Sequence, residues 1–346
     1  MVDYCNAPGL TPIEDAMSQL LAQVNVTKKI EKILLGQALG RILAADQISP
    51  LFIPPADNSA MDGYTLKSTE GASGNTLTVV DKVFSGHPIK RVVQGGECVR
   101  IMTGGQIPQG CDTVIMQENV SVTDGTIVIN QSCKAAENIR KKGEDISQGQ
   151  TVLFKGRRLT AADIGVLASL GHGAVSVFKK LNVALISTGD ELKKPGETLA
   201  AGQFYESNGY TVSALLQRLE VNIIDFGIIP DALNLLSKAF SDADGQADVV
   251  ISSGGVSVGE ADYSKSVIEK LGNIAFWKLA IKPGKPFAFG HLPSSYFIGL
   301  PGNPVSATVT LHQLAVPLLR KVAGESEKVP LRLAATSLST MRKRPG

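Results

Sequence analysis

Residues 248–262 have the residue types and spacing that an anion site needs. The β-branched run 249–251 predicts a strand that is buried on both faces. Small residues follow it and let backbone N–H groups approach a ligand closely: Ser252, Ser253, Gly254 and Gly255. Because a buried strand that opens into such a loop often holds phosphate in α/β proteins, we expect an anion here. The carboxylates Glu260 and Asp262 come next, where a helix can begin.

Further charged residues follow other predicted strands. Lys282 and Lys285 lie in a turn stiffened by proline and glycine, which can aim their ammonium groups at an anion or leave them simply solvated. Five acidic side chains would repel a phosphate unless a divalent cation lay between: Asp190, Glu191, Asp231, Glu260 and Asp262. Since Mg²⁺ takes one or two carboxylates together with phosphate oxygens, the pattern predicts a phosphorylated substrate and a magnesium ion.

A competing motif points to a different chemistry. Residues 255–259 match the Gly-x-Ser-x-Gly nucleophile elbow, but residues 252–254 separate them from the strand. The histidines downstream are His291 and His312, and the second lies in a predicted packing helix. The segment also lacks the Gly-x-Gly-x-x-Gly fingerprint. Serine hydrolysis and dinucleotide binding are therefore disfavoured.

The elements that must position these residues alternate between strands and helices from Asn182 onward. Strands are predicted at 183–186, 221–229, 249–251 and 274–281, with short β runs at 287–289 and 296–298. Helices are predicted at 208–219, 232–240, 264–271 and 305–322. The last one has Asn303 as its cap and Pro304 at its first position.

This order predicts a doubly wound, mostly parallel, three-layer α/β domain with its site at the carboxyl ends of the strands. The candidate residues follow such ends: Thr188, Asp190, Asp231, the 252–255 loop and Lys282.

The preceding third of the chain has a different residue pattern. Between residues 50 and 149, prolines and glycines separate short β runs at 77–80, 99–102, 114–116 and 126–129, which is typical of a small β-rich domain. Three polar clusters lie in it, at 57–64, 103–105 and 138–145. Each is compatible with turn chemistry or with a site.

Helical patterns flank the β-rich region. Residues 11–14 read as a capping box, a short helical run surrounds 37–44, and 159–170 predict a helix with Thr160 as N-cap, followed by a β run at 174–178. We expect a discontinuous linker domain (6–50 and 146–178), an inserted β-rich domain (51–145) and the α/β domain (179–326). A β-like run at 331–338 would begin a C-terminal β domain (327–346) that is largely absent.

Composition limits the function classes. The 346 residues are 43% hydrophobic and carry a net charge of +2, which gives no global case for binding nucleic acid or a membrane. The four cysteines are scattered, which favours free thiols in a reducing compartment. No signal peptide or spanning segment is evident, and we expect a cytoplasmic protein.

Seven ordered motifs closely resemble those of the molybdopterin molybdenumtransferases, the bacterial MoeA proteins, which are related to the E domain of gephyrin. They are DNSAMDGY (57–64), IMTG (101–104), GED (143–145), STGDE (187–191), SSGGVSVG (252–259), IKPGKP (281–286) and LPGNPVS (300–306). The resemblance covers nearly the whole chain. It implies the last step of molybdenum cofactor synthesis, in which adenylylated molybdopterin and molybdate give the cofactor and AMP with Mg²⁺.

The resemblance also implies an elongated homodimer in which the α/β domain of one subunit faces the β domain of the other. Carried over by motif, the β domain contributes Asp62, Thr103 and Asp145. The α/β domain contributes Glu191, Asp231, Asp262, Lys278, Lys282, Pro301 and Pro304.

Binding residues are expected in the same motifs: Ser252, Ser253, Gly254, Gly255, Ser257, Gly259, Lys285, Gly302, Asn303 and Ser306. Lys282, Lys285 and Ser306 are the candidates for molybdate, and Glu191 and Asp262 for Mg²⁺, while Asp231 is expected to meet the nucleotide.

Two expectations concern the protein as a whole. Family members carry a C-terminal β domain that helps to form the molybdate site, and this chain stops near its start. The alternative function is a non-catalytic molybdopterin-binding or scaffolding protein of the same fold. A contact with the preceding molybdopterin adenylyltransferase is a further possible partnership.

Overall fold

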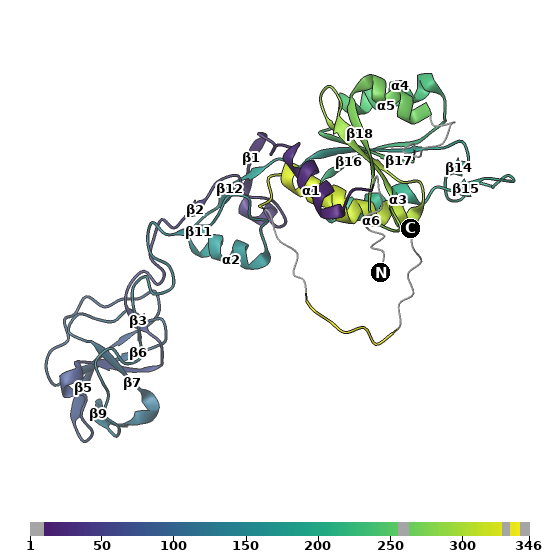
Figure 1. The fold of residues 1–346 in the computed structure, drawn as a ribbon. Coiled ribbons are helices and arrows are strands. Elements are labelled where there is room, and N and C mark those ends of the chain that lie inside the picture. Colours follow the sequence, from purple (N-terminus) through teal and green to yellow (C-terminus); the bar gives the residue numbers. More distant parts are fainter. Residues whose placement is uncertain (1–9, 255–262, 327–332, 340–346) are drawn as a thin grey trace. The chain divides into compact units, whose positions relative to one another are not determined.

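The computed structural model describes residues 10–254, 263–326 and 333–339, and the chain divides into two compact units (Figure 1). Unit 1 comprises Met1–Ala45 and Lys155–Gly346, and unit 2 comprises Asp46–Phe154. Unit 2 is therefore an insertion in the chain of unit 1. Within the described residues, no helix is long and apolar enough to cross a membrane.

A six-stranded sheet forms the centre of unit 1. Its strands, in order across the sheet, are β16 (Asn222–Ile229), β13 (Asn182–Thr188), β17 (Val249–Ser253), β20 (Tyr296–Leu300), β19 (Pro286–His291) and β18 (Asn273–Lys278). The first four are parallel, and β19 is antiparallel to both of its neighbours. β18 consequently runs in the same direction as the parallel strands, so that five of the six strands end at one edge.

Helices cover both faces of this sheet (Figure 1). On one face lie α1 (Ile13–Ala22), α3 (Asn208–Gln217), α6 (Pro304–Thr310) and α7 (Val316–Val322), packed on a large apolar cluster. On the other face, α4 (Leu233–Asp244) and α5 (Tyr263–Leu271) pack on a second cluster that includes Phe240 and Phe297. The α/β class and the mostly parallel sheet predicted from the sequence are confirmed.

The predicted long helix at 305–322 is interrupted. α6 ends at Thr310, a π-helical turn covers Leu311–Ala315, and α7 follows. Pro317 lies in the first turn of α7, where it lacks an N–H and its ring would clash with a carbonyl of a regular helix. The wider π turn accommodates that ring.

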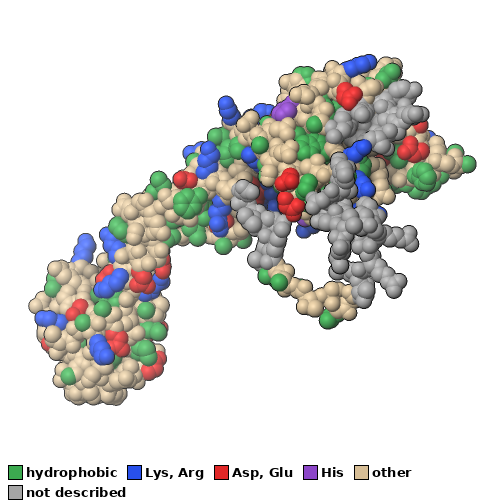
Figure 2. Space-filling view, in the orientation of Figure 1, with side chains coloured by type: hydrophobic (Ala, Val, Ile, Leu, Met, Phe, Trp, Pro, Cys, Tyr) green, Lys and Arg blue, Asp and Glu red, His purple; other side chains and the backbone are tan. Residues whose placement is uncertain are grey.

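The rest of unit 1 consists of short elements. β1 (Ile30–Leu34) pairs with β12 (Ala174–Phe178), and α2 (Ala161–Ser169) begins at the predicted N-cap Thr160, which forms a capping box with Asp163. β14 (Leu192–Lys193) pairs with β15 (Phe204–Tyr205) in an arm that exposes Leu199. Hydrophobic side chains are visible on this arm in Figure 2.

Unit 2 is built on a second six-stranded sheet. Its order is β7 (Thr113–Met116), β4 (Gly63–Leu66), β6 (Glu97–Ile101), β5 (Thr76–Val83), β9 (Thr126–Ile129) and β8 (Val120–Thr123). All pairs are antiparallel except β5 with β6. Two short ladders accompany the sheet: β3 (Asn58–Ser59) with β10 (Ile139–Arg140), and β2 (Gln47–Ile48) with β11 (Thr151–Leu153).

Three local predictions were wrong. Thr11 does not cap α1, because its N–H and C=O bond to Lys278 and Ala280 in a β-bridge, and Pro12 takes the cap position. Helix at 37–44 is limited to a 3₁₀ turn at Leu35–Gln37, since the positive φ of Gly40 (+75°) and the bridge of Ile42 to Arg158 are incompatible with a helix over the following residues. The described part of 331–338, residues 333–338, forms no strand and is exposed.

Candidate functional site

The candidate site of unit 1 lies at the edge where the five strands end. β13 runs into Gly189 and Asp190, β16 into Pro230 and Asp231, and β17 into Gly254. β18 leads into the turn 279–285, and β20 into 301–303. The convergence predicted from the sequence is therefore present in the described residues.

Ser252 and Ser253 were expected to lie in a loop. They are instead the last two residues of β17. They pair with Gly299 and Leu300 of β20 in the parallel ladder and are buried. Pairing on both sides of the strand keeps their backbone groups occupied, so they cannot cradle a ligand. The loop begins only at Gly254.

Gly254 occupies a position that a side chain would disturb. Its φ is +93°, and its N–H donates to the carbonyl of Leu300 at 3.2 Å. A Cβ would lie 3.0 Å from both the carbonyl and the hydroxyl oxygen of Thr188. A glycine is required here because the backbone of β17 passes close to the end of β13. The other predicted loop residues, Gly255, Ser257, Gly259, Glu260 and Asp262, lie outside the described residues.

The acids after β13 and β16 form a connected pair of turns. Asp190 accepts a hydrogen bond from the backbone N–H of Asp231 at 3.0 Å. The carboxylate of Glu191 folds back over Gly189, with its oxygens 2.6 and 2.8 Å from the position of a Cβ on that glycine. Asp190 thus joins the two turns, while Glu191 lies beside the end of β13.

The lysine turn between β18 and β19 packs against α6. The N–H of Leu279 donates to the carbonyl of Lys285 at 2.7 Å and closes the turn. A Cβ on the buried Gly284 would lie 2.9 Å from the methyl group of Thr310 in α6. Lys282 and Lys285 are exposed, and neither pairs with a carboxylate in the described part of the chain. Lys278, the last residue of β18, is also exposed.

The amino end of α6 has the predicted cap. The side-chain oxygen of Asn303 accepts from the N–H of Ser306 at 3.1 Å and from its hydroxyl at 3.3 Å. Pro304 is the first helical residue, and Pro301 is buried just before the exposed Gly302. The hydroxyl contact is long for an O–H donor, so Ser306 can turn its hydroxyl toward a ligand at little cost.

Sequence reasoning missed two residues at the amino end of α3. Glu206 is buried, and its carboxylate accepts from the N–H of Gly209 at 2.6 Å. Asn208 donates its amide to the carbonyl of Gly302 at 2.8 Å, which ties α3 to the turn before α6. Glu-Ser-Asn before a helical run is a capping signal that could have identified them.

Unit 2 brings its three polar clusters together. β3, from the first cluster, pairs with β10 of the third, and the N–H of Ser59 donates to Gly105 of the second. Asp57 accepts from the ammonium group of Lys141 at 2.9 Å and from the N–H of Lys142 at 2.8 Å. These bonds, with the Lys141 side chain foremost, lower the pKa of Asp57.

The predicted residues Asp62 and Thr103 are in direct contact. One carboxylate oxygen of Asp62 accepts from the hydroxyl of Thr103 at 2.7 Å and from its N–H at 2.8 Å. The hydroxyl bond, followed by the backbone bond, lowers the pKa of Asp62. Asp145 instead pairs with Arg140, and no described bond joins it to Asp62. The two predicted acids therefore lie in separate hydrogen-bonded pairs.

The acidic side chains at the strand ends offer few ligands for a magnesium ion by themselves. Across residues 10–254, 263–326 and 333–339, no group of three His, Cys, Asp or Glu side chains is placed to hold a metal ion. Glu191 offers hard oxygen donors of the kind that Mg²⁺ prefers, and this ion commonly takes one or two carboxylates and completes its shell with substrate. Glu191 therefore fits a magnesium ion that is held jointly by the protein and the substrate.

The three cysteines among the described residues take no part in either cluster. Cys98, Cys111 and Cys133 are free thiols. Burial raises the pKa of Cys98 to about 12 and that of Cys111 to about 11, so both stay protonated at neutral pH. A protonated, buried thiol is a poor nucleophile and metal ligand.

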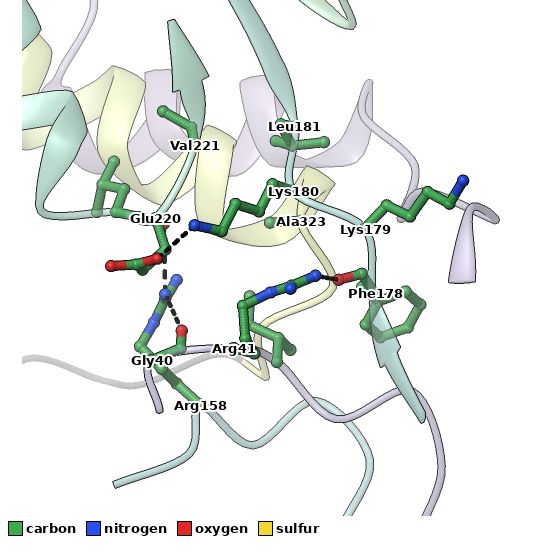
Figure 3. Close-up of a pocket in the computed structure, with 12 residues that line it drawn as sticks. Gly40, Arg41, Arg158, Phe178, Lys179, Lys180, Leu181, Glu220, Val221 and Ala323 are labelled. Atoms are coloured by element: carbon green, nitrogen blue, oxygen red, sulfur yellow. Dashed lines mark hydrogen bonds and ion pairs between the residues drawn. The ribbon is translucent and has the colours of Figure 1, made fainter. Parts of the chain in front are cut away.

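A small pocket lies at the opposite edge of the unit 1 sheet, where β13 and β16 begin (Figure 3). Arg41 donates to the carbonyl of Phe178, Arg158 to that of Gly40, and Lys180 pairs with Glu220. Its volume of about 20 Å³ has room for about one water molecule. These cations hold neighbouring segments together, and the pocket is separate from the candidate site.

Comparisons with known proteins agree with these features. Residues 11–171 match the family model "MoeA N-terminal region (domain I and II)", and residues 184–321 match "Probable molybdopterin binding domain". A molybdopterin molybdenumtransferase of Haemophilus influenzae is 46% identical over 96% of this chain and 83% of its own length. One from a Nostoc species is 35% identical over 93% of this chain and 76% of its own.

A solved structure shows that the similarity extends to the fold. The molybdopterin biosynthesis MoeA protein of Pyrococcus horikoshii superposes with a TM-score of 0.79 at 30% identity, covering 92% of this chain and 80% of that one. Fold and sequence similarity thus agree over most of the chain. The chain belongs to the molybdopterin molybdenumtransferase (MoeA) family of transferases, which act in molybdenum cofactor biosynthesis.

Proposed function

We propose that the chain inserts molybdate into adenylylated molybdopterin and releases AMP, the last step of molybdenum cofactor synthesis. The observation that carries this proposal is the meeting of acids, cations and a glycine turn at one sheet edge of unit 1. Glu191, Asp231 and Gly254 follow three neighbouring strands, and the lysine turn packs on the helix that carries Ser306.

The cations suit the smaller substrate. Molybdate is a tetrahedral dianion, and Lys282 and Lys285 are exposed in a turn that is closed by its own backbone bond. The hydroxyl of Ser306 can leave its long bond to Asn303 and donate to the same anion. These three residues are therefore the proposed molybdate ligands.

The acids can hold the larger substrate through a divalent cation. Without that cation they would repel its phosphates. Glu191 and Asp262 are the proposed magnesium ligands, and Mg²⁺ supplies charge neutralisation when it is bound. Asp231 is proposed to contact the nucleotide, since its turn is held to that of Asp190. The motif residues from Gly254 onward, Gly254, Gly255, Ser257 and Gly259, are proposed to contact molybdopterin. In the proposed homodimer, Asp62, Thr103 and Asp145 from unit 2 of the other subunit are proposed to complete the reacting groups.

The chain is further proposed to act in the cytoplasm as a homodimer, which can receive its substrate from the preceding adenylyltransferase. Exposed apolar side chains that could lie in such an interface include Ile30 and Leu34 on β1 and Leu39 just beyond it.

A magnesium titration tests the acids directly. We expect Mg²⁺ to bind weakly to the free protein and at least tenfold more tightly with adenylylated molybdopterin, because substrate phosphate completes the ion's shell. Glu191→Gln should remove that gain, whereas Glu197→Gln, an exposed carboxylate nearby, should not. Equal affinity with and without substrate, or activity that survives thorough chelation, would contradict the proposed role.

A further inference from the structure

The contact between Asn208 and Gly302 joins two elements that meet at the candidate site. Asn208 is the first residue of α3, and its amide donates to the carbonyl of Gly302 at 2.8 Å. Gly302 directly precedes Asn303, the cap that fixes Ser306 in α6. A change at Asn208 therefore reaches Ser306 through the turn.

The other end of the same side chain is unusual. Its carbonyl oxygen is shielded from solvent and has no hydrogen-bond partner among the described residues. Turning the amide over would place that oxygen against the Gly302 carbonyl, which also accepts, so the orientation is fixed by the contact. A buried acceptor without a donor destabilises the fold, and its presence calls for a role other than stability.

Neighbouring residues already hold the amino end of α3 without Asn208. Glu206 accepts from the N–H of Gly209, and α3 packs on α6 through the apolar cluster that includes Val212 and Leu216. The exposed Gly302 carbonyl can accept from water if the amide is lost. Loss of the Asn208 contact should therefore cost the fold little stability. The 301–303 turn, however, would lose the bond that holds its conformation.

We propose that Asn208 is a positioning residue for molybdate, which acts by holding the 301–303 turn so that Ser306 and the lysine turn share one anion. The inference rests on the proposed function. It predicts that affinity for molybdate depends on Asn208 more strongly than stability does.

The test is a calorimetric titration with molybdate alone, supported by steady-state kinetics. Asn208→Leu keeps the approximate shape and removes both the donor and the unpaired acceptor. We expect the Kd and the KM for molybdate to rise about tenfold, the effect of about one hydrogen bond, with turnover at saturating molybdate within twofold of wild type. The melting temperature should stay within a few degrees.

Two further variants separate the outcomes. Asn208→Ser, which suits a helix terminus, should weaken molybdate binding in the same way as Asn208→Leu. Ser207→Ala alters a neighbouring exposed side chain that makes no cap bond, and should leave binding and melting unchanged. Unchanged molybdate affinity in both Asn208 variants, or a loss that follows a lower melting temperature, would overturn the positioning role alone. A wild-type protein that does not bind molybdate would contradict the proposed site itself.

Discussion

At the scale of single residues, charge in this protein is controlled by short hydrogen bonds. Both donors of Thr103 converge on one oxygen of Asp62. Asp57 accepts from Lys141 on one carboxylate oxygen and from the N–H of Lys142 on the other. A lowered pKa means that each acid favours the folded state while it is ionised. This stabilisation is fully present at a pH above 3.8, the ordinary pKa of an aspartate. It is lost as the pH falls through the lower pKa that each acid has in the folded state.

Replacing the Thr103 hydroxyl should move the Asp62 pKa in a defined direction. Thr103→Val removes the first of the two donors and keeps the backbone N–H. We expect the pKa of Asp62 to rise toward 3.8 without fully reaching it. Carboxyl-carbon NMR during a pH titration measures both acids at once, and Asp57 serves as the internal control. An unmoved Asp62, or an equal shift of Asp57, would show that the contact does not set the charge.

At the scale of elements, the sequence predicted the strand ends well, because buried β runs and the polar residues after them are local signals. Asn303 and Thr160 were identified as caps for the same reason. The expected loop at Ser252 and Ser253 failed because pairing with neighbouring strands extended β17. Asn208 was missed because its partner, Gly302, is remote in the sequence.

The turn after β17 should resist even the smallest side chain. Gly254→Ala places a Cβ 3.0 Å from two Thr188 oxygens at a φ of +93°. We expect the free energy of unfolding to fall by about 1–2 kcal/mol, measured by denaturant titration. Gly173→Ala, with no atom near the added group and no positive φ, is the matched control. If both variants were equally stable, the close approach of β13 and β17 would be in doubt.

The capping box of α2 offers a test that is independent of function. Thr160→Ala removes the side chain that bonds to Asp163 and should cost about 1 kcal/mol. Burial alone would raise the pKa of Asp163, but its bonds to Arg157 and Thr160 outweigh burial and lower it. Ser207→Ala, at a cap position without a side-chain bond, should change the unfolding free energy much less. Similar losses in the two variants would argue against the cap.

At the scale of the whole molecule, the chain has two units with separate cores and separate polar clusters. The change of texture near residue 50 predicted an inserted β-rich region, and unit 2 covers Asp46–Phe154. Charge could not have predicted the sites, because a net charge of +2 hides acids and lysines gathered at one sheet edge. The β-like run at 331–338 misled because its described part has no partner strand to pair with.

The central claim is molybdate insertion with loss of AMP, and the measurement that tests it most directly is AMP release from adenylylated molybdopterin. Product can be quantified by chromatography in four mixtures, with and without molybdate and with and without Mg²⁺. We predict AMP only where both are present, together with newly formed molybdenum cofactor. Binding of the substrate without AMP release would contradict the account and favour a non-catalytic molybdopterin-binding protein. AMP release that does not depend on molybdate would also contradict it.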